Sequence, residues 1–245
     1  MDKNSYIFGI RAIIEAIEAG KTIDKILIRR DLGGELASEL NALVKDRDIP
    51  VQRVPLEKLN RITRKNHQGA IAMLSPVEYY RIDQLIPTIY ESGKNPFFII
   101  LDGLTDTRNF GAIARTASCA GADAIIIPER NSVSVTPDAV KTSAGALMSL
   151  PVCRVKSVAE AVKELQANGI KVVAASEKAT AEYDNGDYTG PIAIVMGAED
   201  VGISDDVLRI CDEIVAIPMT GPIASLNVSV AAGIVIYAVV RSRRS

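Results

Sequence analysis

The sequence predicts an α/β protein of two domains, a small N-terminal one and a larger C-terminal one built around a parallel sheet. In residues 97–245, short apolar runs alternate with helical patterns, and the runs lack the polar alternation of a sheet with one exposed face. Residues 76–96 contain three prolines and a Ser-Gly-Lys-Asn cluster, a composition typical of a domain connection. Residues 1–75 hold 13 Lys/Arg against 10 Asp/Glu, whereas the remainder holds 15 against 20. We therefore expect a domain at 1–75, a connection at 76–96 and a domain at 97–245.

The totals fit an ordered globular protein. The chain has 245 residues, of which 48% are hydrophobic and 24% charged, and this is enough apolar material for a full core. Residues 1–11 alternate polar and apolar side chains and do not resemble a signal peptide. The longest apolar run, Val228–Val240, is interrupted by Ser229 and is shorter than the roughly 18–20 residues that span a bilayer. We expect a cytoplasmic protein that does not enter a membrane.

Cysteine and histidine usage argues against metal chemistry. Cys119, Cys153 and Cys211 are far apart and have no Cys-x-x-Cys spacing, and His67 is the only histidine. Neither a disulfide framework nor a zinc site has enough ligands at a suitable spacing. We therefore expect no metal.

The N-terminal domain is predicted to be a small α/β sandwich. Apolar residues recur at helical spacing in Gly9–Ala19 and Leu36–Val44. The segments Ile23–Ile28, Val51–Val54 and Ala70–Leu74 have the pattern of strands.

A basic run lies before the last of these strands. Within thirteen residues it contains Arg53, Lys58, Arg61, Arg64 and Lys65, and it is followed by His67-Gln68-Gly69. Such a run is often only a solvated face, and a contact with nucleic acid is the alternative. The run alone does not decide between the two.

The C-terminal domain is predicted from its regular alternation of elements. The expected strands are Phe97–Leu101, Ala124–Ile127, Val152–Val155, Val172–Ala175, Ile192–Met196 and Ile214–Ile217. The expected helices are Asn109–Ala120, a segment within Pro137–Leu147, Val158–Ala167, Asp205–Ile210 and the final helix from Val228. In parallel sheets of this kind, ligands bind beyond the carboxyl ends of the strands. The loops at those ends are therefore the candidate site.

The first candidate loop follows the strand at Phe97–Leu101. Asn109 is a suitable N-cap for the next helix, and Gly111 allows close backbone approach. Arg115 lies within two turns of the helix start. Taken alone, these residues also fit a capped helix with an exposed arginine.

The second candidate loop is Gly197-Ala-Glu-Asp-Val-Gly202. Two glycines at a strand end indicate tight turns around a ligand, and Glu199 suits a hydroxyl, an amine or a cation. The chain has neither the Gly-Lys-Ser/Thr of triphosphate sites nor the Gly-x-Gly-x-x-Gly of dinucleotide sites. Alternatively, Glu199 lies in the first turn of the following helix, where the helix dipole favours an acid.

The third candidate loop runs from Ile217 into the final helix. It places Ser225 and Asn227 at the helix start, where polar side chains meet free backbone N–H groups. No Gly-x-Ser-x-Gly elbow surrounds Ser225, so we interpret it as a positioning or capping group rather than a nucleophile. A plain N-cap pair is the alternative.

Together these segments resemble the three signature motifs of the SpoU (TrmH-like) RNA ribose 2′-O-methyltransferases of the SPOUT class. Asn109–Arg115 is similar to the first motif, Met196–Gly202 to the second, and Ile217-Pro-Met with Ser225-Leu-Asn-Val-Ser-Val-Ala-Ala to the third. Thr107 and Phe110 depart from the proline and leucine that are common in the family.

The resemblance extends to the N-terminal domain. Residues 1–75 resemble the family's L7Ae/L30e-like substrate-binding module, and His67-Gln68-Gly69 matches the close of that module. This points to the branch that methylates a guanosine of 23S rRNA, so the resemblance implies RNA as the partner. A tRNA ribose 2′-O-methyltransferase of the same fold and a noncatalytic RNA-binding protein are the alternatives.

The resemblance also implies a C-terminal domain with a deep trefoil knot that binds S-adenosylmethionine. By motif matching, Gly197, Ile217 and Leu226 would contact this cofactor, with Ala175 nearby. Small residues there would let backbone groups reach the ligand.

A homodimer whose sites draw on both chains is a further implication of the resemblance. The apolar helix from Val228 to Val240 gives an independent reason to expect a buried interface. A helix buried only within its own chain is the alternative.

The implied reaction is in-line transfer of a methyl group to a ribose 2′-oxygen. Arg115 is the key residue by motif matching. Because a guanidinium stays charged in proteins, we interpret it as a clamp on an RNA phosphate or a developing oxyanion rather than as a base. The residues expected to hold Arg115 and the ribose in place are Asn109, Glu199, Ser225 and Asn227.

Overall fold

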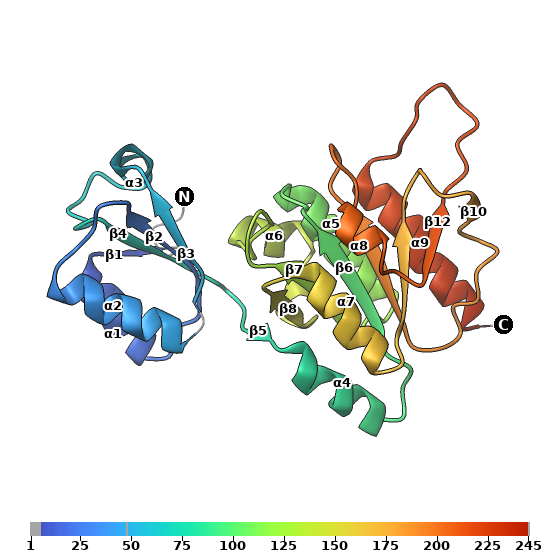
Figure 1. The fold of residues 1–245 in the computed structure, drawn as a ribbon, viewed down its shortest axis with the longest axis horizontal. Helices are drawn as coiled ribbons and strands as arrows, with labels where there is room; N and C mark the ends of the chain where they lie inside the picture. The colour runs from blue at the N-terminus through green and yellow to red at the C-terminus, as the bar shows by residue number, and fades with distance from the viewer. Residues whose placement is uncertain (1–5, 48, 245) are drawn as a thin grey trace. The chain divides into compact units, whose positions relative to one another are not determined.

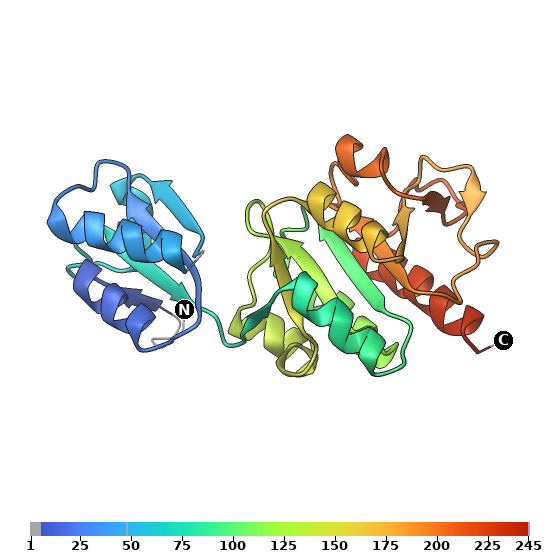
Figure 2. The same cartoon turned by 60° about the horizontal axis from the view of Figure 1, so that its bottom comes forward.

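The computed structural model describes residues 6–47 and 49–244. The chain divides into two compact units, Met1–Glu78 with Ser134–Pro137 and Tyr79–Val133 with Asp138–Ser245. Figures 1 and 2 show the elements of each unit, coloured from the N-terminus to the C-terminus. No helix in the described ranges is long and apolar enough to cross a membrane.

The first unit is a four-stranded sheet with helices on both faces. Its elements are β1 (Tyr6–Phe8), α1 (Ile10–Glu18), β2 (Ile23–Arg29), α2 (Glu35–Asp46), β3 (Val51–Val54), α3 (Leu56–Ile62) and β4 (Ala70–Leu74). The strands lie in the order β1-β4-β2-β3. Strand β4 pairs antiparallel with β1 and β2, and β3 pairs parallel with β2.

Different helices cover the two faces of this sheet. On one face, Ile14 of α1 and Leu40 of α2 pack with Ile26 of β2. On the other face, Leu59 of α3 packs with Leu27, the next residue of β2. Neighbouring residues of a strand point to opposite faces, so α3 lies across the sheet from α1 and α2. Helix α3 was not among the expected elements, because it is short and more than half of it is charged or polar.

The turn at His67–Gly69 closes the first unit. Gln68 and Gly69 have φ of 52° and 82°, in the left-handed region that glycine adopts without strain. Gln68 Oε1 accepts the N–H of Ile10, the first residue of α1, at 3.2 Å. His67 Nδ1 accepts the Gly69 N–H at 3.0 Å, which leaves its Nε2 to donate to Asn60 Oδ1 of α3 at 3.0 Å. These contacts join α1, α3 and β4 at one turn.

The second unit is built on an eight-stranded sheet in which all neighbouring strands are parallel, as the apolar runs predicted. The strands are β5 (Tyr79–Tyr80), β6 (Phe97–Asp102), β7 (Ala124–Pro128), β8 (Val152–Val155), β9 (Lys171–Ala175), β10 (Ala181–Glu182), β11 (Ile192–Gly197) and β12 (Glu213–Ala216). They lie in the order β10-β12-β9-β11-β6-β7-β8-β5.

Helices cover both faces of this sheet as well (Figures 1 and 2). They are α4 (Ile82–Glu91), α5 (Thr107–Cys119), α6 (Pro137–Thr142), α7 (Val158–Ala167), α8 (Asp205–Leu208) and α9 (Val228–Ser242). On one face, Ile86 of α4 and Val162 of α7 pack with Phe98 of β6. On the other face, α5 and α9 pack against each other, and α9 lies against β11.

Two segments differ from the expected pattern. Residues 76–96, expected as a connection, contain β5 and α4, and the isoleucines of α4 are buried in the core of the second unit. Pro87 lies inside α4. Because proline is unfavourable in a helix interior, the sequence did not indicate a helix here. Within Pro137–Leu147, α6 ends at Thr142, because Ala144 and Gly145 adopt φ of 52° and 87°.

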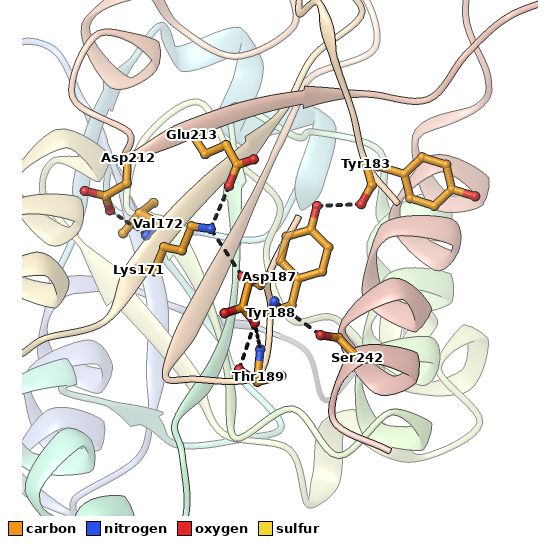
Figure 3. Close-up of polar contacts among 9 residues, drawn as sticks. All are labelled: Lys171, Val172, Tyr183, Asp187, Tyr188, Thr189, Asp212, Glu213 and Ser242. Atoms are coloured by element: carbon orange, nitrogen blue, oxygen red, sulfur yellow. Dashed lines mark hydrogen bonds and ion pairs between the residues drawn. The ribbon is translucent and has the colours of Figure 1, made fainter. Parts of the chain in front are cut away.

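A polar cluster holds the segment between β9 and β11 (Figure 3). Lys171 Nζ lies 2.6 Å from Glu213 Oε2 on β12, and it donates to the carbonyl of Asp187 at 3.2 Å. The cluster therefore ties the start of β9 to β12 and to the segment that leads into β11. The trefoil knot implied by the resemblance stays a prediction.

Tyr188 is the buried centre of this cluster. Its side chain is 2% exposed, and its hydroxyl donates to the carbonyl of Tyr183 in the same segment. Its backbone N–H donates to Ser242 Oγ at the end of α9, at 3.3 Å. A Cβ at Gly186 would lie 2.5 Å from the Tyr188 ring, so this position requires glycine.

We expect Tyr188→Phe to lower the free energy of unfolding by about 1 kcal/mol at neutral pH, the net value of one hydrogen bond. Burial, with smaller effects from Glu213 and Asp184, raises the pKa of Tyr188 from 10.0 to about 12. The unfolded chain therefore releases this proton first as the pH rises. The stability that the neutral hydroxyl contributes is present below pH 10 and is lost between pH 10 and about 12.

Urea denaturation of parent and variant at about pH 8 and about pH 11 tests this. The difference between the two free energies of unfolding should shrink at the higher pH. Other alkaline groups are common to both proteins and cancel in the difference. A difference that stays constant with pH would contradict the assignment.

Candidate active site

Three segments of the second unit meet at the carboxyl ends of β6 and β11. Asn109 of α5 donates from Nδ2 to Glu199 Oε1 at 2.7 Å. Asn227, which precedes α9, donates from Nδ2 to the same carboxylate oxygen at 2.8 Å and to Asn109 Oδ1 at 3.2 Å. We call these three residues the Asn-Glu-Asn group. It takes one residue from each of the three loops that the sequence indicated.

Asn109 is not the N-cap of α5, contrary to expectation. The helix begins at Thr107, and the carboxylate of Asp106 accepts the Asn109 N–H at 2.7 Å. Asp and Asn are equally good N-caps, so the residue three positions earlier takes this role. Asn109 lies inside the first turn, and its amide is free to reach Glu199.

Asn227 is the N-cap of α9, a role that the sequence left open beside one in the site, and it also belongs to the Asn-Glu-Asn group. Its Oδ1 accepts the N–H of Ser229 at 3.0 Å and the hydroxyl of Ser229 at 2.6 Å. Its Nδ2 makes the contacts to Glu199 and Asn109. The two ends of one amide therefore connect the helix start to the site. Ser225 does not cap the helix and lies in the exposed loop before it.

The loop that carries Glu199 is tightly folded. Ala198 and Gly202 form an isolated antiparallel bridge, with N–H to carbonyl distances of 3.1 and 2.9 Å. A Cβ at Gly197 would lie 2.2 Å from the carbonyl carbon of Gly202, so the bridge can form only with glycine there. Helix α8 begins at Asp205, so Glu199 lies before its first turn and does not serve as a dipole partner.

Asp102 fixes the far end of this loop to β6. Its Oδ2 accepts the N–H of Ser204 at 2.8 Å and the hydroxyl of Ser204 at 2.6 Å. Asp102 is the last residue of β6 and lies beside Gly197 in the sheet register. Both ends of the loop are thus attached at one sheet edge, which defines where Glu199 lies.

Arg115 does not contact the Asn-Glu-Asn group within the chain. It follows Asn109 by six residues on α5, about 9 Å along the axis and on another side of the helix, because each residue turns the helix by about 100°. Its side chain is exposed and forms no hydrogen bond or ion pair with residues 6–47 and 49–244. The expectation that Asn109, Glu199, Ser225 and Asn227 hold Arg115 is therefore not met within one chain.

A small cavity of about 90 Å³ opens at the carboxyl ends of β9, β11 and β12. Four of the expected residues line it: Ala175, Ile217, Ser225 and Leu226. Gly197 does not, and its small size serves the close approach of Gly202 instead. The other lining residues are Ser176, Glu177, Met196, Val215, Met219, Ala224 and Ala231.

Some of these residues could have been found from the sequence. Ser176 and Glu177 directly follow β9, where the rule that ligands bind beyond strand ends applies. The sequence gives no polar signal at Met219, Ala224 or Ala231. Their place in the cavity lining depends on how the loop before α9 and the start of α9 fold over the strand ends. Within the described ranges, no group of three or more His, Cys, Asp or Glu side chains is placed to hold a metal ion.

Comparison with protein families gives two matches. Residues 96–237 match the family described as "SpoU rRNA Methylase family". Residues 6–80 match the one described as "RNA 2'-O ribose methyltransferase substrate binding". The two matches correspond to the major parts of the two units.

Individual proteins are similar over the same lengths. A protein of Bacillus subtilis (strain 168) named as a TrmH family tRNA/rRNA methyltransferase is 36% identical over 241 residues, covering 98% of this chain and 97% of that protein. The SpoU methyltransferase AviRb from Streptomyces viridochromogenes, solved in complex with AdoMet, has a TM-score of 0.62 and 27% identity, covering 98% and 90% of the two chains. The A. aeolicus TrmH/SpoU tRNA modifying enzyme has a TM-score of 0.57 and 26% identity, covering 66% and 84%.

We expect Gly197→Ala to destabilise the second unit by about 1–3 kcal/mol or more, because the added Cβ collides with backbone rather than with a flexible side chain. Gly190→Ala is the matched control, since a Cβ there meets nothing within 4 Å. Urea denaturation of both variants measures the difference. Equal stability of the two would show that the bridge at Ala198 and Gly202 can rearrange without cost.

Proposed function

The chain belongs to the SpoU rRNA methylase family, and we propose that it methylates a ribose 2′-hydroxyl of RNA, a guanosine of 23S rRNA in particular. The observation that carries this proposal is the Asn-Glu-Asn group. It joins the three motif segments by hydrogen bonds at the sheet edge where parallel α/β proteins bind ligands. The match of residues 6–80 to a ribose methyltransferase substrate-binding module supports the choice of the 2′-oxygen.

S-adenosylmethionine is the cofactor of this family, and the cavity beside β9, β11 and β12 fits it chemically. Ala175, Ala224 and Ala231 keep side chains short where backbone groups must reach a ligand, and Glu177 offers a carboxylate for hydroxyl or cationic groups. Bound there, the cofactor supplies an electrophilic methyl group on a sulfonium.

The loop between Ile217 and Asn227 must move outward to admit this cofactor. The cavity of about 90 Å³ is smaller than the roughly 300 Å³ at which ligand pockets begin. Ile223 in this loop is 75% exposed, so little apolar contact holds the loop in place. We assign cofactor contacts to Ala175, Ile217 and Leu226, because these residues line the cavity. We assign none to Gly197, which does not line it.

The polar residues of the site would orient the acceptor ribose. Glu199 Oε1 is occupied by two amide donors, and its other carboxylate oxygen has no partner among the described residues. That oxygen and the hydroxyl of Ser225 are the groups we assign to the ribose. Arg115 carries a positive charge suited to a phosphate or a developing oxyanion.

Arg115 would complete the site of a second copy of the chain. Within its own chain it lies on a different side of α5 from Asn109, and its side chain has no hydrogen-bond or ion-pair partner among the residues that the structure describes. Helix α9, which packs along α5, presents Val230 and Tyr237 at 51% and 49% exposure, an apolar stripe suited to a dimer interface. We propose a homodimer in which each site combines an Asn-Glu-Asn group with the partner subunit's arginine.

A tRNA is the second candidate substrate, because the relatives are named for tRNA and rRNA together. The tRNA modifying enzyme of A. aeolicus matches only 66% of this chain, whereas the match to AviRb covers 98% and takes in the N-terminal unit. The presence of this unit favours the larger RNA.

We expect Arg115→Ala to bind S-adenosylmethionine as the parent does and to lose RNA methylation by at least about 100-fold, the typical cost of losing one charge-stabilising group. Lys163→Ala removes an exposed cation on α7 and is the control for a general charge effect. Isothermal titration with the cofactor and methyl transfer to RNA measure the two properties. Full activity of Arg115→Ala would overturn the assignment.

Mixing inactive variants tests whether the site is shared. In a mixture of Arg115→Ala and Asn109→Ala, each mixed dimer keeps one intact site, so about a quarter of the parent activity should return after random exchange. If each chain used its own arginine, the mixture would stay inactive. Asn109→Ala mixed with Glu199→Ala is the control and should not recover in either case.

The substrate is tested by mapping ribose methylation in RNA from cells that lack this protein. We expect one 2′-O-methylguanosine of 23S rRNA to disappear and to return when the parent protein is supplied. Supplying Arg115→Ala should not restore it. A loss confined to tRNA would overturn the choice of rRNA while keeping the reaction.

A further inference from the structure

Helix α3 and the turn after it carry most of the positive charge on one side of the first unit. Residues 56–66 contain a single carboxylate, Glu57, and four cations, Lys58, Arg61, Arg64 and Lys65. All four cationic side chains are exposed. We call these four residues the α3 face.

The cations of the α3 face are not neutralised by any carboxylate in the described part of the chain. The side chains of Lys58, Arg61 and Arg64 form no hydrogen bond or ion pair with any residue in the described ranges. Lys65 Nζ lies 5.7 Å from the centre of the Phe8 ring. Unpaired cations of this kind are free to contact phosphates.

The two helices on the other side of the sheet carry the opposite net charge. Helices α1 and α2 together contain five carboxylates and two cations, and they pack on the sheet face away from α3. One of these cations, Arg11, lies 3.6 Å from Glu15 and 3.8 Å from Glu39. The helices on the two faces of the sheet therefore differ in net charge, and the positive one is α3 with the turn after it.

The positive side also has a groove and a fixed helix. An open groove of about 650 Å³ is lined by Pro55, Glu57, Lys58, Arg61 and Ile62. Leu59 is fully buried beneath α3, and His67 holds Asn60 at 3.0 Å. The cations of α3 are thus presented by a helix that is anchored at its centre and near its end.

We propose that the α3 face binds the phosphate backbone of the RNA substrate, and that the surface of α1 and α2 faces away from the RNA. The inference rests on the proposed function and adds to it which side of the first unit contacts the substrate. The difference in charge favours this orientation, because the five carboxylates of α1 and α2 would repel the phosphates.

The test compares two triple variants that remove the same charge from opposite sides. Lys58→Gln, Arg61→Gln and Arg64→Gln together neutralise the α3 face. Lys21→Gln, Lys45→Gln and Arg47→Gln together neutralise three exposed cations on the side of α1 and α2. Binding of an unmodified 23S rRNA transcript is measured across a range of salt concentrations, and methylation is measured at limiting and saturating RNA.

For the α3 variant we expect binding weaker by about tenfold or more and a salt dependence whose slope falls by about 2, since each lost phosphate contact removes about 0.7–0.9. KM for RNA should rise while kcat at saturating RNA stays close to the parent value. The control triple variant should bind like the parent. A parent-like kcat of the α3 variant excludes a folding defect. The charge-preserving set Lys58→Arg, Arg61→Lys and Arg64→Lys should keep the parent affinity, which separates the effect of charge from that of side-chain shape.

The inference would be overturned if both triple variants lost RNA affinity equally, or if the α3 variant bound RNA like the parent. It would also be overturned if affinity fell only with intact ribosomal subunits, because that result indicates a contact with protein. Failure of the proposed function gives a different result. In that case the parent binds the transcript through the α3 face and transfers no methyl group.

Discussion

One carboxylate oxygen, Glu199 Oε1, accepts hydrogen bonds from two amides that belong to two other segments, and the geometry of the site depends on this shared acceptor. The three residues are partly or fully exposed, so each hydrogen bond contributes only modestly to stability. These hydrogen bonds matter because they fix the positions of the three loops relative to one another. Without the shared oxygen, the Glu199 side chain would no longer join the other two loops, and the single hydrogen bond between Asn227 and Asn109 would be the only contact left within the Asn-Glu-Asn group.

The position of this oxygen is fixed by the sheet and by the contacts of the Glu199 loop. Parallel pairing of β6 with β11 brings Asp102 beside Gly197, and Asp102 then holds Ser204 at the other end of the Glu199 loop. The missing side chain at Gly197 lets Gly202 approach. Sheet register, one carboxylate and one glycine together place Glu199 where Asn109 and Asn227 can reach it.

Much of this arrangement follows from the sequence, because apolar runs without polar alternation predict parallel strands whose carboxyl ends share one edge. The exact partners do not follow. Asp106 and Asn109 are both good N-caps, and only the three-dimensional structure decides that Asp106 caps the helix and Asn109 meets Glu199. Likewise, helix α4 was hidden by prolines, and the short, charged α3 shows how little apolar pattern a helix needs when one residue, Leu59, is buried.

Asn227 couples the start of α9 to the site. The same amide caps α9 through its oxygen and completes the site through its nitrogen, so the helix start and the site share one side chain. The end of α9 is in turn held by Tyr188 at the far edge of the sheet. One helix therefore links the site at the carboxyl ends of the strands to the polar cluster around Tyr188.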